Sequence, residues 1–100
     1  MKFGVYAIED IKIESFSSPF TSPNNNTAMR QFGDVATDPN TNINRHPDDY
    51  RLCRLGEWDD QSGEFTSEKP TTLAWAKDYH GGPEKKTNAA TAQLSATGIN

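Results

Sequence analysis

The stretch from His46 to Phe65 constrains the fold of this chain more than any other segment. Its sequence, HPDDYRLCRLGEWDDQSGEF, predicts a helical turn, a strand, a tight turn and a second strand in that order. Pro47 suits the first position of a helical turn, because it has no N–H to leave unpaired and its φ is already fixed. The run Tyr50–Trp58 is rich in aromatic and branched residues, and Gly63 can adopt the positive φ that closes a short hairpin loop. The segment therefore predicts a β-hairpin.

Further strands are expected on both sides of this hairpin. Phe3–Ile8 (FGVYAI) is apolar on both alternating faces, which favours a strand in the middle of a sheet. Ile11–Phe20 is a weaker strand that can pair back on the first, and its prolines favour an edge position. After the hairpin, Glu68–Pro70 predicts a turn, and Thr71–Ala76 predicts one more strand, with a short helix as the alternative.

One amphipathic helix is predicted between the early strands and the hairpin. The run Asn24–Asn26 supplies side-chain carbonyls that can cap a helix N-terminus. The apolar residues that follow lie on one helical stripe, namely Ala28, Met29, Phe32, Val35 and Ala36. Pro39 ends the helix, and Asn40–Asn44 is expected to be a polar loop. The fold class predicted is α+β, an antiparallel sheet of four to five strands with one amphipathic helix packed on a face.

The domain organisation follows from where apolar residues cluster. Residues 1–79 are expected to form a single α+β domain, and residues 80–100 a flexible Gly/Ala/Thr-rich C-terminal tail. A domain of this size buries only about 60–65% of the surface of its unfolded chain, so a homodimer is compatible with its small core. The first apolar run is too short for a signal peptide and no segment is long enough for a membrane span, so we expect no membrane association.

The charge balance limits binding to nucleic acid. The chain has 14 acidic and 10 basic residues, a net charge of −4, so phosphate contacts require a local basic patch. The candidate nucleic-acid-binding residues are Arg45, Tyr50, Arg51 and Arg54, because arginines interleaved with aromatic residues can hold a single strand. On an ideal strand Arg51 and Arg54 point to opposite faces. The alternative is that these arginines pair with the surplus carboxylates.

Residues that could carry chemistry are present without a diagnostic spacing. His46, Asp48, Asp49, Cys53 and His80 could form a metal site or a Cys–His pair, but His46–Asp49 is explained more simply as a capped turn. Glu57, Asp59, Asp60 and Glu64 could pair for hydrolysis, but they are better explained as solvating the hairpin loop, with Asp59 capping its turn. Cys53 is the only cysteine, which excludes an intramolecular disulfide. We expect no enzyme, no metal and no cofactor.

A set of segments together resembles a known family. These are FGVYAI at Phe3–Ile8, Pro19, AMRQF at Ala28–Phe32, HPDDYRL at His46–Leu52 and LGEWDDQSGEF at Leu55–Phe65. In order and spacing, over residues 2–76, the chain resembles the small nonstructural protein of gokushovirus-like Microviridae, which are single-stranded DNA phages. The resemblance implies a protein of the host cytoplasm that is absent from the mature virion. It also implies an accessory role in the switch from duplex replication to single-stranded DNA synthesis and packaging.

Two functional hypotheses follow. In the first, the protein meets single-stranded DNA or the viral or host replication proteins through the arginine–tyrosine set named above. In the second, it is an acidic protein–protein adaptor that acts on a replication protein or procapsid without touching DNA. The contact would then be an exposed strand edge or an apolar patch that includes Phe16, Phe20 or Trp75.

Overall fold

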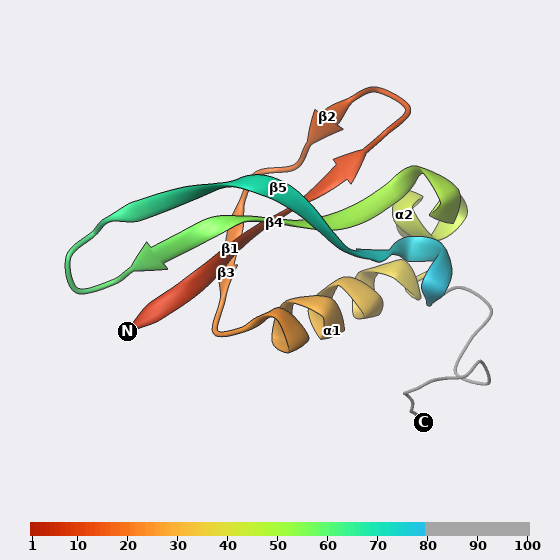
Figure 1. The fold of residues 1–100 in the computed structure, drawn as a ribbon. Helices are drawn as coiled ribbons and strands as arrows, with labels where there is room; N and C mark the ends of the chain where they lie inside the picture. The colour runs from red at the N-terminus through yellow and green to blue at the C-terminus, as the bar shows by residue number, and fades with distance from the viewer. Residues whose placement is uncertain (80–100) are drawn as a thin grey trace.

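Five strands form one antiparallel sheet, and a long helix crosses one of its faces (Figure 1). The computed structural model describes residues 1–79, so the predicted tail and His80 lie outside the described residues. The strands are β1 (Lys2–Asp10), β2 (Ser15–Phe16), β3 (Phe20–Ser22), β4 (Tyr50–Asp59) and β5 (Phe65–Trp75). The helices are α1 (Asn25–Ala36) and α2 (Asn42–Arg45), with 3-10 turns η1 (Pro47–Asp49) and η2 (Ala76–Asp78). The α+β prediction is confirmed.

Strand β1 lies in the middle of the sheet, as its apolar pattern predicts. It pairs antiparallel with β4 over its whole length, from Lys2 opposite Asp59 to Asp10 opposite Tyr50. Its other edge carries the short strands β2 and β3, and β5 continues the sheet beyond β4. The buried middle position explains why both sides of Phe3–Ile8 are apolar.

The predicted hairpin is confirmed as β4 and β5. Gly63 adopts a φ of 78°, and its N–H donates to the Asp59 carbonyl at 2.8 Å. The Asp59 carboxylate accepts from the Gln61 N–H at 2.9 Å, so the predicted capping role is also confirmed. Because a hydrogen bond from the Gln61 N–H stabilises the charged carboxylate, the pKa of the Asp59 carboxyl lies below its ordinary value.

The turn predicted at Glu68–Pro70 is wrong. Strand β5 runs through these residues without interruption. Arg54 pairs with Thr71 and Gly56 pairs with Ser67, so three β5 residues stand opposite Leu55 alone and form a bulge. Proline is tolerated at a bulge on an edge strand because no ladder bond needs its missing N–H.

Two other segments differ from the prediction. The segment Asn40–Asn44 is not simply a loop, because α2 begins at Asn42, where the Thr41 hydroxyl accepts from the Asn44 N–H at 3.1 Å. The weak strand predicted over Ile11–Phe20 is confirmed only in part. It is reduced to β2 and the first residue of β3, and the chain turns through Glu14, whose φ is 55°.

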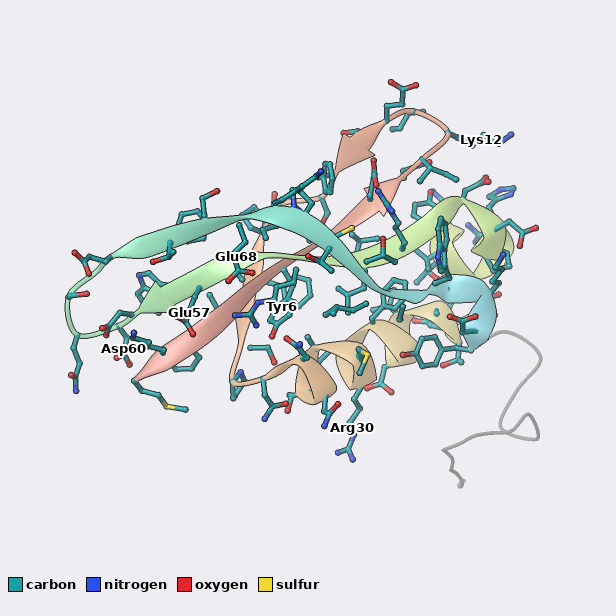
Figure 2. All side chains as sticks on the ribbon, viewed as in Figure 1. Tyr6, Lys12, Arg30, Glu57, Asp60 and Glu68 are labelled. Carbon is teal, nitrogen blue, oxygen red and sulfur yellow. The ribbon has the colours of Figure 1, made fainter. Side chains whose placement is uncertain are left out.

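The core lies between α1 and the sheet. The Asn24 side chain caps α1 by accepting from the Thr27 N–H at 2.8 Å, and Phe32 of the predicted stripe is fully buried. From the sheet, Tyr6 and Leu52 fill the space beneath the helix; Figure 2 shows Tyr6 pointing toward α1 and Arg30 pointing away from the sheet. Phe32, Tyr6 and Leu52 are the only large aromatic or aliphatic side chains in the described part that are fully buried. The half-buried rings of Phe20, Tyr50 and Tyr79 pack against this core.

Candidate nucleic-acid interface

The sheet has a covered face, which packs against α1, and an uncovered face with no helix over it in the described part of the chain (Figure 1). Side chains alternate between faces along a strand. Since Tyr6 and Leu52 point to the covered face, Ala7, Arg51 and Cys53 point to the uncovered one. Two rows of large side chains cross this uncovered face.

The first row, here called the ion-pair row, runs across four strands. Glu9 on β1 pairs in register with Phe16 on β2 and with Arg51 on β4, and Arg51 pairs with Trp75 on β5. The Arg51 Nε donates to the Glu9 carboxylate at 2.6 Å, and Nη1 donates to the Thr72 hydroxyl. An aromatic residue therefore stands at each end of the row and a hydrogen-bonded ion pair in its middle.

Two cationic side chains lie close to the Trp75 ring. The Arg51 Cζ lies 5.7 Å from the ring centroid, and the Lys77 Nζ lies 5.6 Å from it. Both distances are within the range in which the ring quadrupole attracts a cation. Trp75 and its two neighbours thus form an aromatic and cationic end to the row.

The second row, here called the aromatic row, crosses three strands. Phe3 on β1 pairs with Trp58 on β4, and Trp58 pairs with Phe65 on β5. The rings of Phe3 and Trp58 are 5.8 Å apart between centroids, and the Phe65 side chain is 53% exposed. Phe65 also leans over Gly56, since a Cβ added there would lie 2.9 Å from its ring.

The strip between the two rows is made of short side chains. It contains Val5, Ala7, Cys53, Gly56, Ser67 and Thr72. Phe3 and Glu9 are six residues apart on β1, which corresponds to roughly 20 Å at the rise of a strand. On this face, a strip of short side chains therefore lies between two rows that contain large ones.

Most carboxylates of the strands lie on the covered side of the sheet, away from this face. Five carboxylates lie within the strands, and Glu9 is the only one on the uncovered face. On the covered side, Asp10 lies opposite Tyr50, Glu57 opposite Gly4, and Asp59 opposite Lys2. The fifth, Glu68, accepts from the Arg54 Nε at 3.2 Å. Because Glu9 is paired with Arg51, the uncovered face offers no free carboxylate to repel an anion within these strands.

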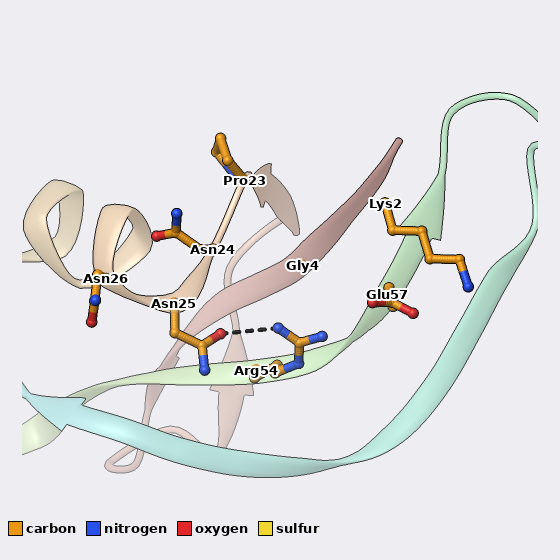
Figure 3. A pocket seen from close by; sticks show the side chains of 8 residues that line it. All are labelled: Lys2, Gly4, Pro23, Asn24, Asn25, Asn26, Arg54 and Glu57. Atoms are coloured by element: carbon orange, nitrogen blue, oxygen red, sulfur yellow. Dashed lines mark hydrogen bonds between the residues drawn. The ribbon is translucent and has the colours of Figure 1, made fainter.

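The covered face has an open groove beside the start of α1, with a volume of about 470 Å³ (Figure 3). Its cationic wall is Arg54, whose Nη1 donates to the Asn25 side-chain carbonyl at 2.9 Å and to the Tyr6 hydroxyl at 3.3 Å. Burial raises the pKa of Tyr6, and the nearby Arg54 acts in the opposite direction. Lys2 and Glu57 also line the groove, so its cations are matched by carboxylates.

The structure does not bring the four predicted nucleic-acid-binding residues together. Arg51 lies on the uncovered face, whereas Arg54 and Tyr50 point to the covered one, as expected from strand alternation. Burial raises the pKa of Tyr50, with Asp10 acting in the same direction. Arg45 lies at the end of α2, where it is exposed and donates to the Asn42 side chain at 2.9 Å.

The three residues predicted for partner binding do not all lie on the same face of the sheet. Phe16 and Trp75 are in the ion-pair row of the uncovered face. Phe20 instead packs on the covered face, with its ring centroid 5.8 Å from that of Tyr6.

The residues considered for metal binding do not form a site in the described range. Among residues 1–79, no three His, Cys, Asp or Glu side chains lie close enough to hold a metal ion. His46 is exposed, whereas Cys53 is fully buried, and burial raises the pKa of its thiol. His46–Asp49 forms the predicted turn, which contains η1, but no side-chain hydrogen bond caps it.

The hairpin carboxylates lie around its loop and along its covered side. Glu57, Asp59 and Glu64 line a hollow of about 50 Å³ with Lys2. The Asp60 carboxylate lies 2.8 Å from the N-terminal ammonium. The carboxylates therefore lie at the surface around the loop, as predicted, and Asp60 also forms an ion pair that was not predicted.

Sequence reasoning missed the aromatic row. The alternation in Phe3–Ile8 and the aromatic residues at Trp58 and Phe65 were visible, but their alignment depends on strand register. Only the β1–β4 and β4–β5 pairings place the three rings in one line.

Residues 3–79 match the family model described as Phage ORF5 protein. The chain belongs to the Phage ORF5 protein family. The match to this family spans both rows of the uncovered face and supports a phage protein, as the resemblance implied. No curated protein and no solved structure is significantly similar to this Phage ORF5 family member. Within residues 1–79, its helices are all too short or too polar to cross a membrane.

Proposed function

We propose that this phage protein is a nonstructural accessory factor that binds single-stranded DNA on the uncovered face of its sheet. The role fits a gokushovirus-like phage of the Microviridae, where it would assist the switch from duplex replication to single-stranded synthesis and packaging in the host cytoplasm. The family match supports a phage accessory protein, and the uncovered face supports the choice of ligand.

The observation that carries the proposal is the pair of rows on that face. Unpaired bases stack on aromatic side chains, and each stacked base contributes about 1–3 kcal/mol. Trp58 and Phe65 offer rings at one end of the face, and Trp75 offers a ring at the other. Arg51 and Lys77 lie beside Trp75, where they can meet the phosphates of the same strand.

The charge distribution within the strands favours a polyanion on this face over the covered face. Four of the five strand carboxylates lie on the covered side, and the fifth is neutralised by Arg51. With so few cations available, binding should depend weakly on salt. The slope of log K against log salt is about −0.7 for each phosphate neutralised on a single strand, so a shallow slope is expected.

Tryptophan fluorescence tests the proposal directly, because the only two tryptophans of the chain, Trp58 and Trp75, both lie on the uncovered face. Oligothymidylate added at ~50 mM salt should quench this emission and bind in a parallel anisotropy titration. Trp58→Ala and Trp75→Ala should each weaken binding about 5- to 150-fold, the equivalent of one lost base stack. Arg30→Ala is the control, since Arg30 is exposed on α1 and points away from the sheet (Figure 2).

Absence of binding at ~50 mM salt would exclude direct contact with DNA. The uncovered face would then favour the adaptor, which binds a viral or host replication protein or procapsid. Phe16 and Trp75 remain available for such a partner. Recovery of the same protein partner from infected cells after nuclease treatment, and its loss with Trp75→Ala, would support that function. A homodimer is compatible with both, and light scattering at micromolar concentration measures it.

A further inference from the structure

We infer that Glu9 is an internal competitor for DNA phosphate at Arg51, and that it sets the affinity of the uncovered face for single strands. This inference rests on the proposed function and names the residue that limits it. The ion pair of Glu9 and Arg51 occupies the middle of the ion-pair row, between the aromatic residues Phe16 and Trp75.

The Arg51 guanidinium is held in place by three neighbours. Its Nε and Nη2 both contact one oxygen of Glu9, at 2.6 and 2.5 Å, and Nη1 donates to the Thr72 hydroxyl. The third neighbour is the Trp75 ring, 5.7 Å away. Thr72 and Trp75 can keep the guanidinium oriented when Glu9 is replaced, because neither contact involves the carboxylate.

A phosphate oxygen can take the place of the Glu9 oxygen. Guanidinium groups bind carboxylates and phosphates with the same forked geometry. The Arg51 side chain is 30% exposed and that of Glu9 is 14% exposed, so the pair is reachable from solvent. A DNA phosphate that binds the Nε and Nη2 edge of Arg51 must therefore displace a carboxylate already bonded to it.

If Glu9 competes with phosphate for Arg51, a neutral residue at position 9 should raise the affinity for single-stranded DNA. Glu9→Gln removes the charge and keeps a side chain of the same size. It should tighten oligothymidylate binding about 5- to 20-fold, because a phosphate can then bind Arg51 without displacing a carboxylate. The matched control is Glu57→Gln, which makes the same chemical change on the covered face. Its affinity should stay within about twofold of the wild type.

The outcomes separate this inference from the proposed function. Wild-type binding with no gain in Glu9→Gln overturns the inference and leaves the DNA-binding function standing. Equal gains in both variants also overturn it, because net charge alone would then explain them. If neither the wild type nor Glu9→Gln binds, both the function and the inference fail.

A second measurement covers the case in which Glu9→Gln does not fold, as checked by circular dichroism. The Arg51 Nε–H resonance of the wild-type protein is followed by NMR while oligothymidylate is added. A shift of this resonance that tracks the tryptophan quenching supports displacement of Glu9. Quenching with an unmoved Arg51 resonance overturns the inference.

Discussion

The guanidinium of Arg54 lies over the ring of Tyr6 on the covered face, with its Cζ 5.8 Å from the ring centroid. Three positions earlier, Arg51 makes the same kind of contact with Trp75 on the opposite face. The two contacts differ in what surrounds them. Arg54 also bonds Asn25, so it links β4 to the start of α1, whereas Arg51 lies on the face that no helix covers in the described residues.

Replacement of Arg54 should reduce stability without weakening DNA binding. Arg54→Met removes the bonds to Asn25 and Glu68 and keeps an apolar stem over Tyr6, so the free energy of unfolding should fall by about 1–3 kcal/mol. Urea unfolding measures the change, with Arg30→Met as the exposed control. An oligothymidylate titration of the same variant should match the wild type; a large loss of affinity would place the DNA on the covered face instead.

Gly56→Ala should destabilise the sheet. A Cβ at this position would lie 2.2 Å from the Thr66 carbonyl oxygen, a backbone atom that cannot move without disturbing the hairpin. Overpacking of this kind costs about 1–3 kcal/mol, which thermal unfolding can detect. Ser67→Ala, at the exposed position opposite Gly56, should stay within about 0.5 kcal/mol of the wild type. Equal stability of Gly56→Ala and wild type would contradict this β4–β5 pairing.

Asp59 should contribute to the loss of stability in acid. Its pKa is lower in the folded chain than in the unfolded one, so its contribution is present above the ordinary Asp pKa of about 3.9. The contribution is lost as the pH falls through the lowered value. Asp59→Asn should therefore show a flatter dependence of unfolding free energy on pH below about 5 than the wild type does. Parallel curves for the two proteins would show that the hydrogen bond from Gln61 has no such effect.

The Cys53 thiol should react slowly with iodoacetamide in the folded protein. Burial both shields the sulfur and raises its pKa, which keeps the reactive thiolate scarce at pH 8.5. Above the ordinary thiol pKa of about 8.5, the unfolded chain ionises while the folded chain does not, so stability should fall as the pH rises. Mass spectrometry of alkylation with and without urea measures the protection. Rapid modification in the absence of urea would mean that the strip between the rows is open to the reagent.

Oligonucleotide length should matter because the two rows are roughly 20 Å apart along β1. A single strand must reach both rows to stack on Trp58 and Trp75 together. Affinity should rise steeply until the oligothymidylate has about 4 or more nucleotides, the lower end of known single-strand site sizes. A dinucleotide that binds as tightly as an octanucleotide would show that only one row is used.

Much of the fold could be predicted because its signals are local. The Asn24 cap, the apolar stripe ending at Ala36 and the turn at Gly63 depend on residues within a few positions of one another. The segment Glu68–Pro70 shows the limit of such signals. Proline beside charged residues fits a turn and a bulge in an edge strand equally well, and only the pairing with β4 selects the bulge.

The candidate site was predicted less completely than the fold. Arg51 and Trp75 were both named from the sequence, but in separate hypotheses. Arg54 was grouped with Arg51, although alternation along β4 sends it to the helix. Phe3 and Phe65 were not named as site residues, because an aromatic residue in a strand can as easily face the core.

Local sequence signals were enough to predict the first strand, the β4–β5 hairpin and the main helix, and to predict that the apolar stripe of this helix packs on a sheet. Strand order and register were decided by the tertiary structure. They bring Phe16, Glu9, Arg51 and Trp75 into one line from four separate strands. The physical reason is that register depends on long-range packing: α1 fixes Tyr6 and Leu52 beneath it, and the two-residue period of a strand then assigns every other side chain to its face.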